Sequence, residues 1–141
     1  MEFAGINYYA IPVAAVISFI FGGIWYSVLA NPWMDAVGKT AEQIKSQSAG
    51  YPFPPAFAVA IVSQLVMAWV LAGLIGHLGP GQVTLANGII SGAFAWLGFV
   101  ATTLATNHGF QGSKTKLTII DGAHWLGVLV LQGGVIGLMG V

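Results

Sequence analysis

The sequence predicts an all-α membrane protein: a four-transmembrane-helix bundle with a short interfacial helix in the first loop. Three observations carry this prediction. The chain has four long apolar stretches, only 6% of its 141 residues are charged, and all four lysines lie in two of the loops between those stretches. An ordinary soluble domain has about 25% charged residues, so lipid must cover most of this chain.

Each apolar stretch is long enough to cross a membrane as a helix. A hydrocarbon core of about 30 Å needs roughly 20 helical residues at 1.5 Å each. The stretches cover about residues 8–29, 53–78, 83–106 and 117–139, within a single transmembrane domain of residues 1–141. They lack the alternation that membrane-barrel strands show, so we expect helices.

Two of the loops carry local structural signals. In the first loop, Thr40 and Gln43 fit a capping box, which predicts a short helix to about Gln47 lying at the membrane surface. The second loop, residues 79–82, reads Gly-Pro-Gly-Gln and is typical of a tight turn. We therefore expect the second and third spans to form an antiparallel hairpin.

The lysines predict an orientation. Lys39 and Lys45 lie in the first loop and Lys114 and Lys116 in the third, while the second loop and both tails have none. Because cytoplasmic loops are enriched in lysine and arginine, we expect loops one and three in the cytoplasm and both termini outside a cell membrane. Lipid and other membrane subunits are the expected partners. Nucleic acid is not, because the formal net charge is zero and there is no basic block.

Small residues recur at four-residue spacing in three of the spans, where they let helix backbones approach closely. They are Ala14, Ser18 and Gly22 in the first span, Gly88 and Gly92 in the third, and Gly133 and Gly137 in the fourth. Packing within the chain and packing between chains are both open. The amides Gln64, Asn87 and Gln132 are expected to bond across helices, with the lining of a solute path as the alternative.

Asn107, His108, Asp121 and His124 form a candidate polar site. Asp121 is the acidic residue nearest a span interior, and His124 follows on the same helix face. One interpretation is convergence of the four near the cytoplasmic surface as a proton-relay or cation site. The interpretation we favour is that Thr118 and Asp121 form a capping box that opens the fourth span.

No cofactor and no metal site are predicted. Two histidines and one aspartate on two helices do not specify a metal site, and cysteine is absent. Trp69, Trp96 and Trp125 lie deeper than an interface belt would place them. We expect them to pack internally, with contact to a lipid, quinone or pigment as the alternative.

Several segments resemble one bacterial family of small four-span membrane proteins, catalogued as domain of unknown function seventeen-sixty-one. They are residues 23–27 (GIWYS), 33–34 (WM), 38–42 (GKTAE) and 117–122 (LTIIDG). Val28 stands where this family's pattern has proline, and His124 lies near a position where tyrosine is frequent. The resemblance implies a four-helix protein of a bacterial inner membrane and brings no activity or catalytic residues.

The expected function is that of a membrane protein without catalytic activity, an accessory or scaffold subunit of a larger complex. No nucleophile, base and orienting group can be assembled from the sequence, which argues against an enzyme. The alternative is a small transporter or channel, possibly homodimeric, that uses Asp121, His124 and the intramembrane amides. Small multidrug exporters depend on a glutamate in the first span, and here that span has no acidic residue.

Overall fold

The computed structural model describes residues 2–141, and these residues form helices and turns without a strand. Four helical rods are long and apolar enough to cross a membrane. They are α1 (Ala10–Val28), α4 (Pro55–Gly76), a third span made of α5 (Leu85–Ala95), η1 (Trp96–Ala101) and α6 (Thr102–Gln111), and α7 (Thr115–Met139). The short helices α2 (Ala30–Val37) and α3 (Ala41–Ser46) follow the first span. The predicted fold class is confirmed.

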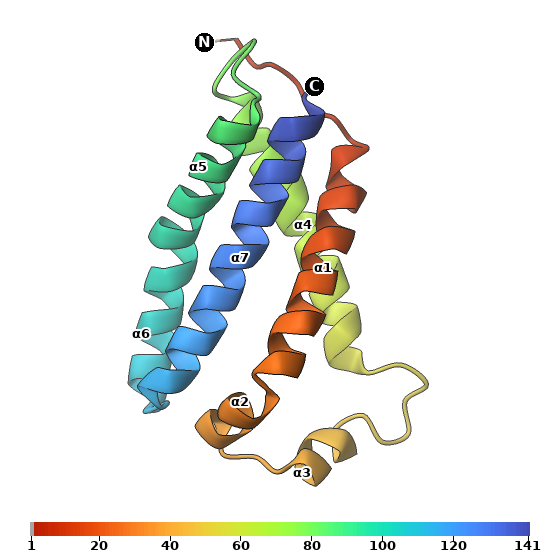
Figure 1. The fold of residues 1–141 in the computed structure, drawn as a ribbon, viewed down its shortest axis with the longest axis vertical. Helices are drawn as coiled ribbons and strands as arrows, with labels where there is room; N and C mark the ends of the chain where they lie inside the picture. Colours follow the sequence, from red (N-terminus) through yellow and green to blue (C-terminus); the bar gives the residue numbers. More distant parts are fainter. Residues whose placement is uncertain (1) are drawn as a thin grey trace.

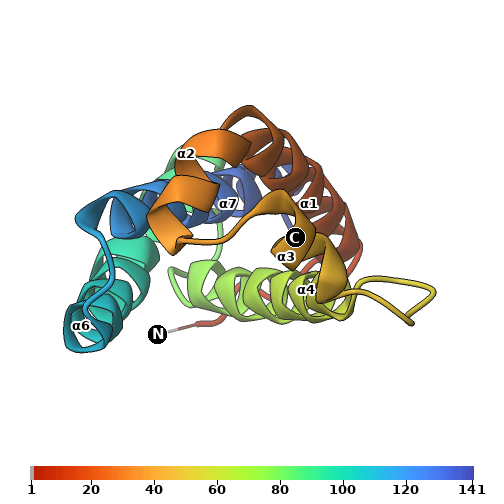
Figure 2. The ribbon, with the colours of Figure 1, turned by 90° about the horizontal axis from the view of Figure 1, so that it is seen from below.

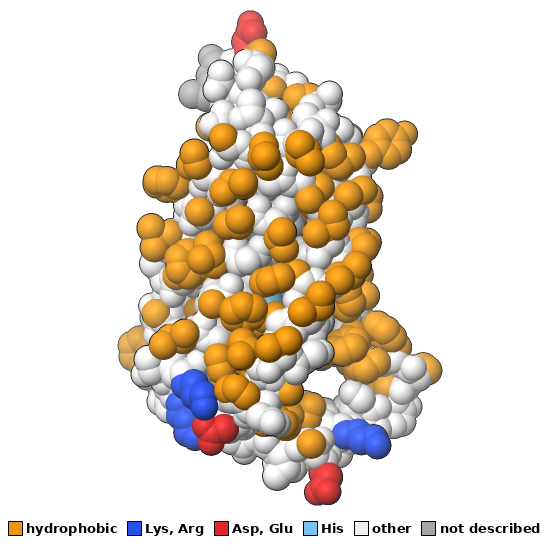
Figure 3. Space-filling model, viewed as in Figure 1, with side chains coloured by type: hydrophobic (Ala, Val, Ile, Leu, Met, Phe, Trp, Pro, Cys, Tyr) orange, Lys and Arg blue, Asp and Glu red, His pale blue; other side chains and the backbone are white. Residues whose placement is uncertain are grey.

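The two ends of the bundle differ in charge. Both termini and the α4–α5 turn lie at one end, while α2, α3 and the α6–α7 turn lie at the other (Figure 1). We call the latter the lysine end, because all four lysines belong to it. Seen from that end, α2 lies across the ends of α1 and α7 (Figure 2). On the face shown in Figure 3, hydrophobic side chains cover the middle and the lysines gather at the lysine end.

Helix α1 stops before α2 because of Pro32. Leu29, between the two helices, departs from helical geometry with φ −99° and ψ 19°. In a continuous helix, Pro32 would have no N–H to donate to the carbonyl of Val28, and its ring would clash with that carbonyl. Helix α2 was not foreseen from the sequence. It ends at Gly38, whose φ of 73° favours glycine.

The short helix expected in the first loop is α3, and its capping box is confirmed. The Gln43 backbone N–H donates to Thr40 Oγ1 at 3.2 Å, and the Thr40 backbone N–H donates to Gln43 Oε1 at 2.9 Å. Each bond satisfies a donor that a helix start leaves unpaired.

The second expected capping box, formed by Thr118 and Asp121, is wrong. Helix α7 begins at Thr115, after an extended Lys114 whose side chain makes no cap. Gly112 ends α6 in the left-handed conformation with φ 68°, so the turn is short and α7 starts early. Thr118 and Asp121 consequently lie inside the helix, where their side chains contact other helices.

Helix α7 is the centre of the bundle. It contacts α1, α4 and the third span, and ten of its 25 residues are buried. Its most extensive contact is with α5, whereas the sequential hairpin partner α4 touches α5 much less. A Cβ added to Gly88 would meet the carbonyl of Gly133, and one added to Gly133 would meet that of Gly88. Gly92 and Gly137 face backbone of the opposite helix in the same way, so these glycines pack within the chain.

Helix α1 turns its small residues inward, and Ala14, Ser18 and Gly22 are all buried. Toward the termini the core between α1, α4 and α7 is apolar. It consists of Ala10, Ile11, Ala14, Ala68, Leu71, Ala72, Ile75, Leu129 and Ile136. Close packing of such small and branched side chains stabilises helix association in lipid, where burial from water contributes little.

Candidate functional site

Three polar side chains meet in the middle of the bundle, one from each of α1, α4 and α7. We call Ser18, Gln64 and Gln132 the amide cluster, and all three are buried. The Ser18 hydroxyl donates to Gln64 Oε1 at 2.6 Å. Gln132 Nε2 donates to Ser18 Oγ at 3.0 Å and to the backbone carbonyl of Gln64 at 3.1 Å. The expectation that Gln64 and Gln132 bond across helices is confirmed.

The same expectation is wrong for Asn87. Its side-chain amide donates to the backbone carbonyl of Gln82 at 2.8 Å, within the preceding turn. The reason is its position: Asn87 lies in the first turn of α5, which Thr84 caps. A polar side chain there serves the end of the helix and does not reach the bundle interior.

A second polar group lies between α1 and α7, nearer the lysine end. We call Tyr26, Asp121 and His124 the tyrosine cluster. The Tyr26 hydroxyl donates to Asp121 Oδ1 at 2.8 Å. The His124 ring lies 4.8 Å from the Tyr26 ring, centroid to centroid, and is parallel to the Phe21 ring at 6.1 Å. Aromatic rings therefore surround the imidazole on its α1 side.

Gly22 makes room for His124. A Cβ on residue 22 would lie 2.8 Å from His124 Nε2. His124 is only 4% exposed, and among residues 2–141 its Nδ1 finds no hydrogen-bond partner. The same holds for Gln132 Oε1. An unpaired buried polar atom costs about 1–3 kcal/mol, so these two atoms are the positions that a small polar molecule would satisfy.

The four residues of the expected polar site do not meet as one group. Asp121 and His124 belong to the tyrosine cluster on the face of α7 toward α1. His108, on α6, contacts Thr118 instead, with Nδ1 and Oγ1 2.9 Å apart. Asn107 is exposed. Helices α1 and α6 lie on different sides of α7 (Figure 2). The Tyr26–Asp121 bond is made on the α1 side and the His108–Thr118 contact on the α6 side.

Two tryptophans hold α7 by its backbone. Trp25 of α1 donates from Nε1 to the carbonyl of Ile120 at 3.1 Å, and Trp96 of η1 donates to that of Gly122 at 2.8 Å. Internal packing is thus confirmed for Trp96. It is wrong for Trp69, which is 53% exposed on the outside of α4, because no other helix in residues 2–141 covers that face.

A protein-family model matches nearly the whole chain. The model, described as "Protein of unknown function (DUF1761)", matches residues 9–137. The chain belongs to the DUF1761 family. The resemblance noted from the sequence is therefore confirmed. No curated protein and no solved structure shows significant similarity to the chain.

In this member of the DUF1761 family, sequence reasoning missed the role of Tyr26. The residue lies in the GIWYS motif at positions 23–27, but the motif does not indicate which residue the hydroxyl contacts. Its partner Asp121 is 95 positions away in the chain, and helix periodicity alone cannot pair residues on different spans. In residues 2–141, no group of three His, Asp or Glu side chains is placed to hold a metal ion.

The lysine end has its own charged contact in this DUF1761 member. Lys116 Nζ lies 3.1 Å from Asp35 Oδ2, and Lys114 Nζ donates to the Asp35 backbone carbonyl at 2.8 Å. The hydrogen bond from Lys116, followed by the charge of Lys114, lowers the pKa of the Asp35 carboxyl. The contact ties α2 to the start of α7 in an exposed setting.

Proposed function

We propose that this chain is a membrane protein without catalytic activity, an accessory or scaffold subunit of a larger complex in a bacterial inner membrane. The observation that carries the proposal is how firmly α7 is held. Glycine faces bring the backbones of α5 and α7 into direct contact, and indoles from both sides bond to the carbonyls of Ile120 and Gly122. A tightly packed bundle of this kind suits a subunit that positions the other subunits of a membrane complex.

The outer surface supports the same proposal. Large apolar side chains are exposed on α4 and along the third span, among them Trp69 at 53% and Phe94 at 72%. In a membrane, such side chains contact lipid or the spans of other subunits. We propose both as partners, and no nucleic acid and no cofactor.

The proposed orientation places the lysine end in the cytoplasm and both termini outside. It is supported by the charge distribution, because all the lysines lie at one end of the bundle. The exposed Tyr8 and Tyr9 beside the start of α1 suit the interface on the opposite side.

The subunit role is tested by isolating the protein from cells that produce it at its natural abundance. An affinity tag on the chromosomal copy, a gentle detergent and mass spectrometry should recover a complex with the same membrane proteins in constant proportion. Trp69→Ala and Phe94→Ala report which outer face holds the partner, since each removes an exposed side chain from a different span. Recovery of only a free monomer contradicts the proposal.

A second function has one specific observation in its favour. Within the described residues 2–141, His124 Nδ1 and Gln132 Oε1 are buried without hydrogen-bond partners. They lie eight residues apart on α7, hence near one face, with Asp121 close by. Such a line suits a proton or small-solute path in a transporter or channel, alone or as a homodimer.

The transporter alternative is tested in vesicles containing the purified protein. Asp121→Asn should then abolish a proton or cation flux, while Asp35→Asn, at an acid outside the spans, should leave it unchanged. An equal flux in the wild type and Asp121→Asn removes Asp121 from any transport mechanism. Thermal unfolding of both variants checks that the fold is intact.

A further inference from the structure

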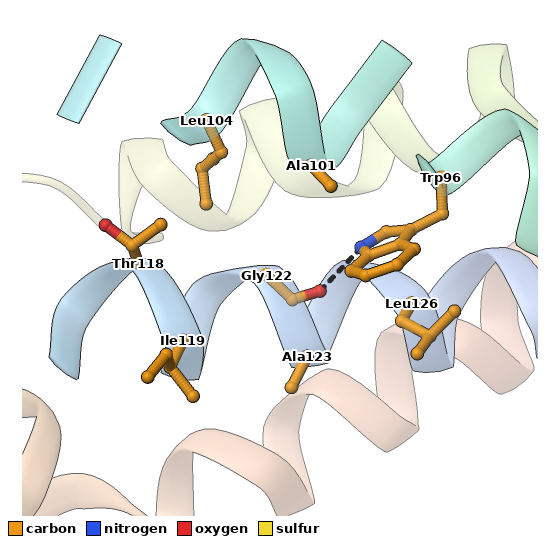
Figure 4. A pocket seen from close by; sticks show the side chains of 8 residues that line it. All are labelled: Trp96, Ala101, Leu104, Thr118, Ile119, Gly122, Ala123 and Leu126. Atoms are coloured by element: carbon orange, nitrogen blue, oxygen red, sulfur yellow. Dashed lines mark hydrogen bonds between the residues drawn. The ribbon is translucent and has the colours of Figure 1, made fainter. Parts of the chain in front are cut away.

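A lateral groove lies between the third span and α7, near the lysine end. It has a volume of about 330 Å³ and is lined almost entirely by apolar side chains. Figure 4 shows Leu104 and Ala101 pointing from the third span toward Thr118 and Gly122 of α7. Trp96 lies at the other end of the groove, its indole bonded to the Gly122 carbonyl.

The groove results from a change in side-chain size along one face of the third span. At Gly92 the backbone of α5 touches α7. One turn later Trp96 stands between the helices and holds them apart. The π-helix η1 begins at Trp96, and its wider turns shift the following residues. Ala101, the last residue of η1, and Leu104 of α6 leave part of the space beside the indole unfilled.

We propose that this groove binds one acyl chain of an anionic phospholipid whose head group is held by Lys114 and Lys116. The groove follows α7 from Thr118 to Leu126, which at 1.5 Å per residue is about 12 Å. One leaflet of the hydrocarbon core is about 15 Å thick, half of the about 30 Å total. The groove therefore matches the depth that one chain occupies, with the head group at the lysine end.

The charges at the mouth of the groove select the head group. Lys114 lies one turn before Thr118, and the side chains of Lys114 and Lys116 are 60% and 50% exposed. One carboxylate, Asp35, is shared between the two ammonium groups, which leaves one positive charge over. Basic groups beside a gap between spans are typical of sites for anionic lipid head groups.

This inference does not depend on the proposed function. A scaffold subunit and a transporter would both retain such a lipid, because the groove is built from packing within the chain. The inference requires only that the spans lie in a membrane.

The test uses the full-length protein in nanodiscs of phosphatidylcholine that contain a small fraction of phosphatidylglycerol with a photoactivatable acyl chain. After irradiation, mass spectrometry should find adducts concentrated around Leu104 and Thr118. An excess of unlabelled phosphatidylglycerol should displace the probe, and additional phosphatidylcholine should not.

Two kinds of variant separate the chain from the head group. Ala101→Phe should fill the groove and remove these adducts, whereas Ala58→Phe, the same change on the exposed side of α4, should leave them. Lys114→Gln combined with Lys116→Gln should lower the yield about fivefold or more, and the matching pair of arginine substitutions should retain it. Adducts spread evenly over the four spans, equal displacement by phosphatidylcholine, or no effect of the glutamine pair would each overturn the proposal.

Discussion

At Gly133 a hydrogen atom occupies a position where any other residue would place carbon against a neighbouring backbone. The obstacle is the carbonyl of Gly88, which cannot rotate away as a side chain can. Gly133→Ala must therefore push α5 and α7 apart and cost about 3 kcal/mol of unfolding free energy. Unfolding by SDS in mixed micelles measures this change.

The control for that prediction is Gly73→Ala on α4. A Cβ there would meet nothing within 4 Å, so the change should be neutral or stabilise by up to about 1 kcal/mol through helix propensity. Equal effects at residues 73 and 133 would mean that backbone contact between α5 and α7 is not what the glycine provides.

Tyr26 is the residue whose loss should most affect the tyrosine cluster. Tyr26→Phe removes the hydroxyl that donates to Asp121 Oδ1 at 2.8 Å and leaves a half-buried carboxyl without that donor. We expect a loss of about 1–2 kcal/mol in the same unfolding assay. Tyr51→Phe, at a tyrosine that is 62% exposed, should change stability much less.

Among the elements, the α2–α7 contact has a predictable pH dependence. Because the folded pKa of Asp35 is lowered, its carboxylate stabilises the contact at neutral pH, and this contribution is lost as pH falls through the folded pKa. Carbon-13 NMR of the carboxyl should give a midpoint below 3.8, the ordinary value. Lys116→Gln should move the midpoint back toward that value, and an unchanged midpoint would show that Lys116 is not the cause.

The existence of the spans could be predicted from the sequence, because length and apolar composition decide which segments enter lipid. The glycine faces and the bonding of Gln64 and Gln132 across helices also followed, without their partners, since small residues and amides have few other roles inside a membrane. Helix boundaries followed less well. Pro32 ends α1, and the start of the expected loop forms α2 instead. A tight turn at Gly112 lets α7 begin at Thr115.

The contacts between distant residues could not be predicted. Nothing local to Tyr26 indicates Asp121, and nothing near Thr118 indicates His108. The π-helix η1 begins at Trp96, and the local sequence does not indicate that the indole bonds to the Gly122 carbonyl, 26 positions away. Sequence spacing fixed which residues share a helix face, while the rotation of each helix in the bundle decided what that face meets.

At the scale of the whole molecule, orientation can be tested cleanly because the chain has no cysteine. Single cysteines introduced at Ser46 and Ser113, at the lysine end, should react with a membrane-impermeant maleimide only after the cells are opened. A cysteine at Gln82, in the opposite turn, should react in intact cells. Labelling of Ser46→Cys from outside would reverse the proposed topology.

Helix α7, on which the bundle closes, is synthesised after the other three spans. At about 5–20 residues per second, synthesis of α7 takes a second or more after the third span is complete. During that interval Ser18 and Gln64 sit without the amide of Gln132, and the glycines of α5 have no surface to fit. A premature stop codon before residue 115 would leave three inserted spans without the helix that contacts all of them, which is the kind of product that membrane proteases remove.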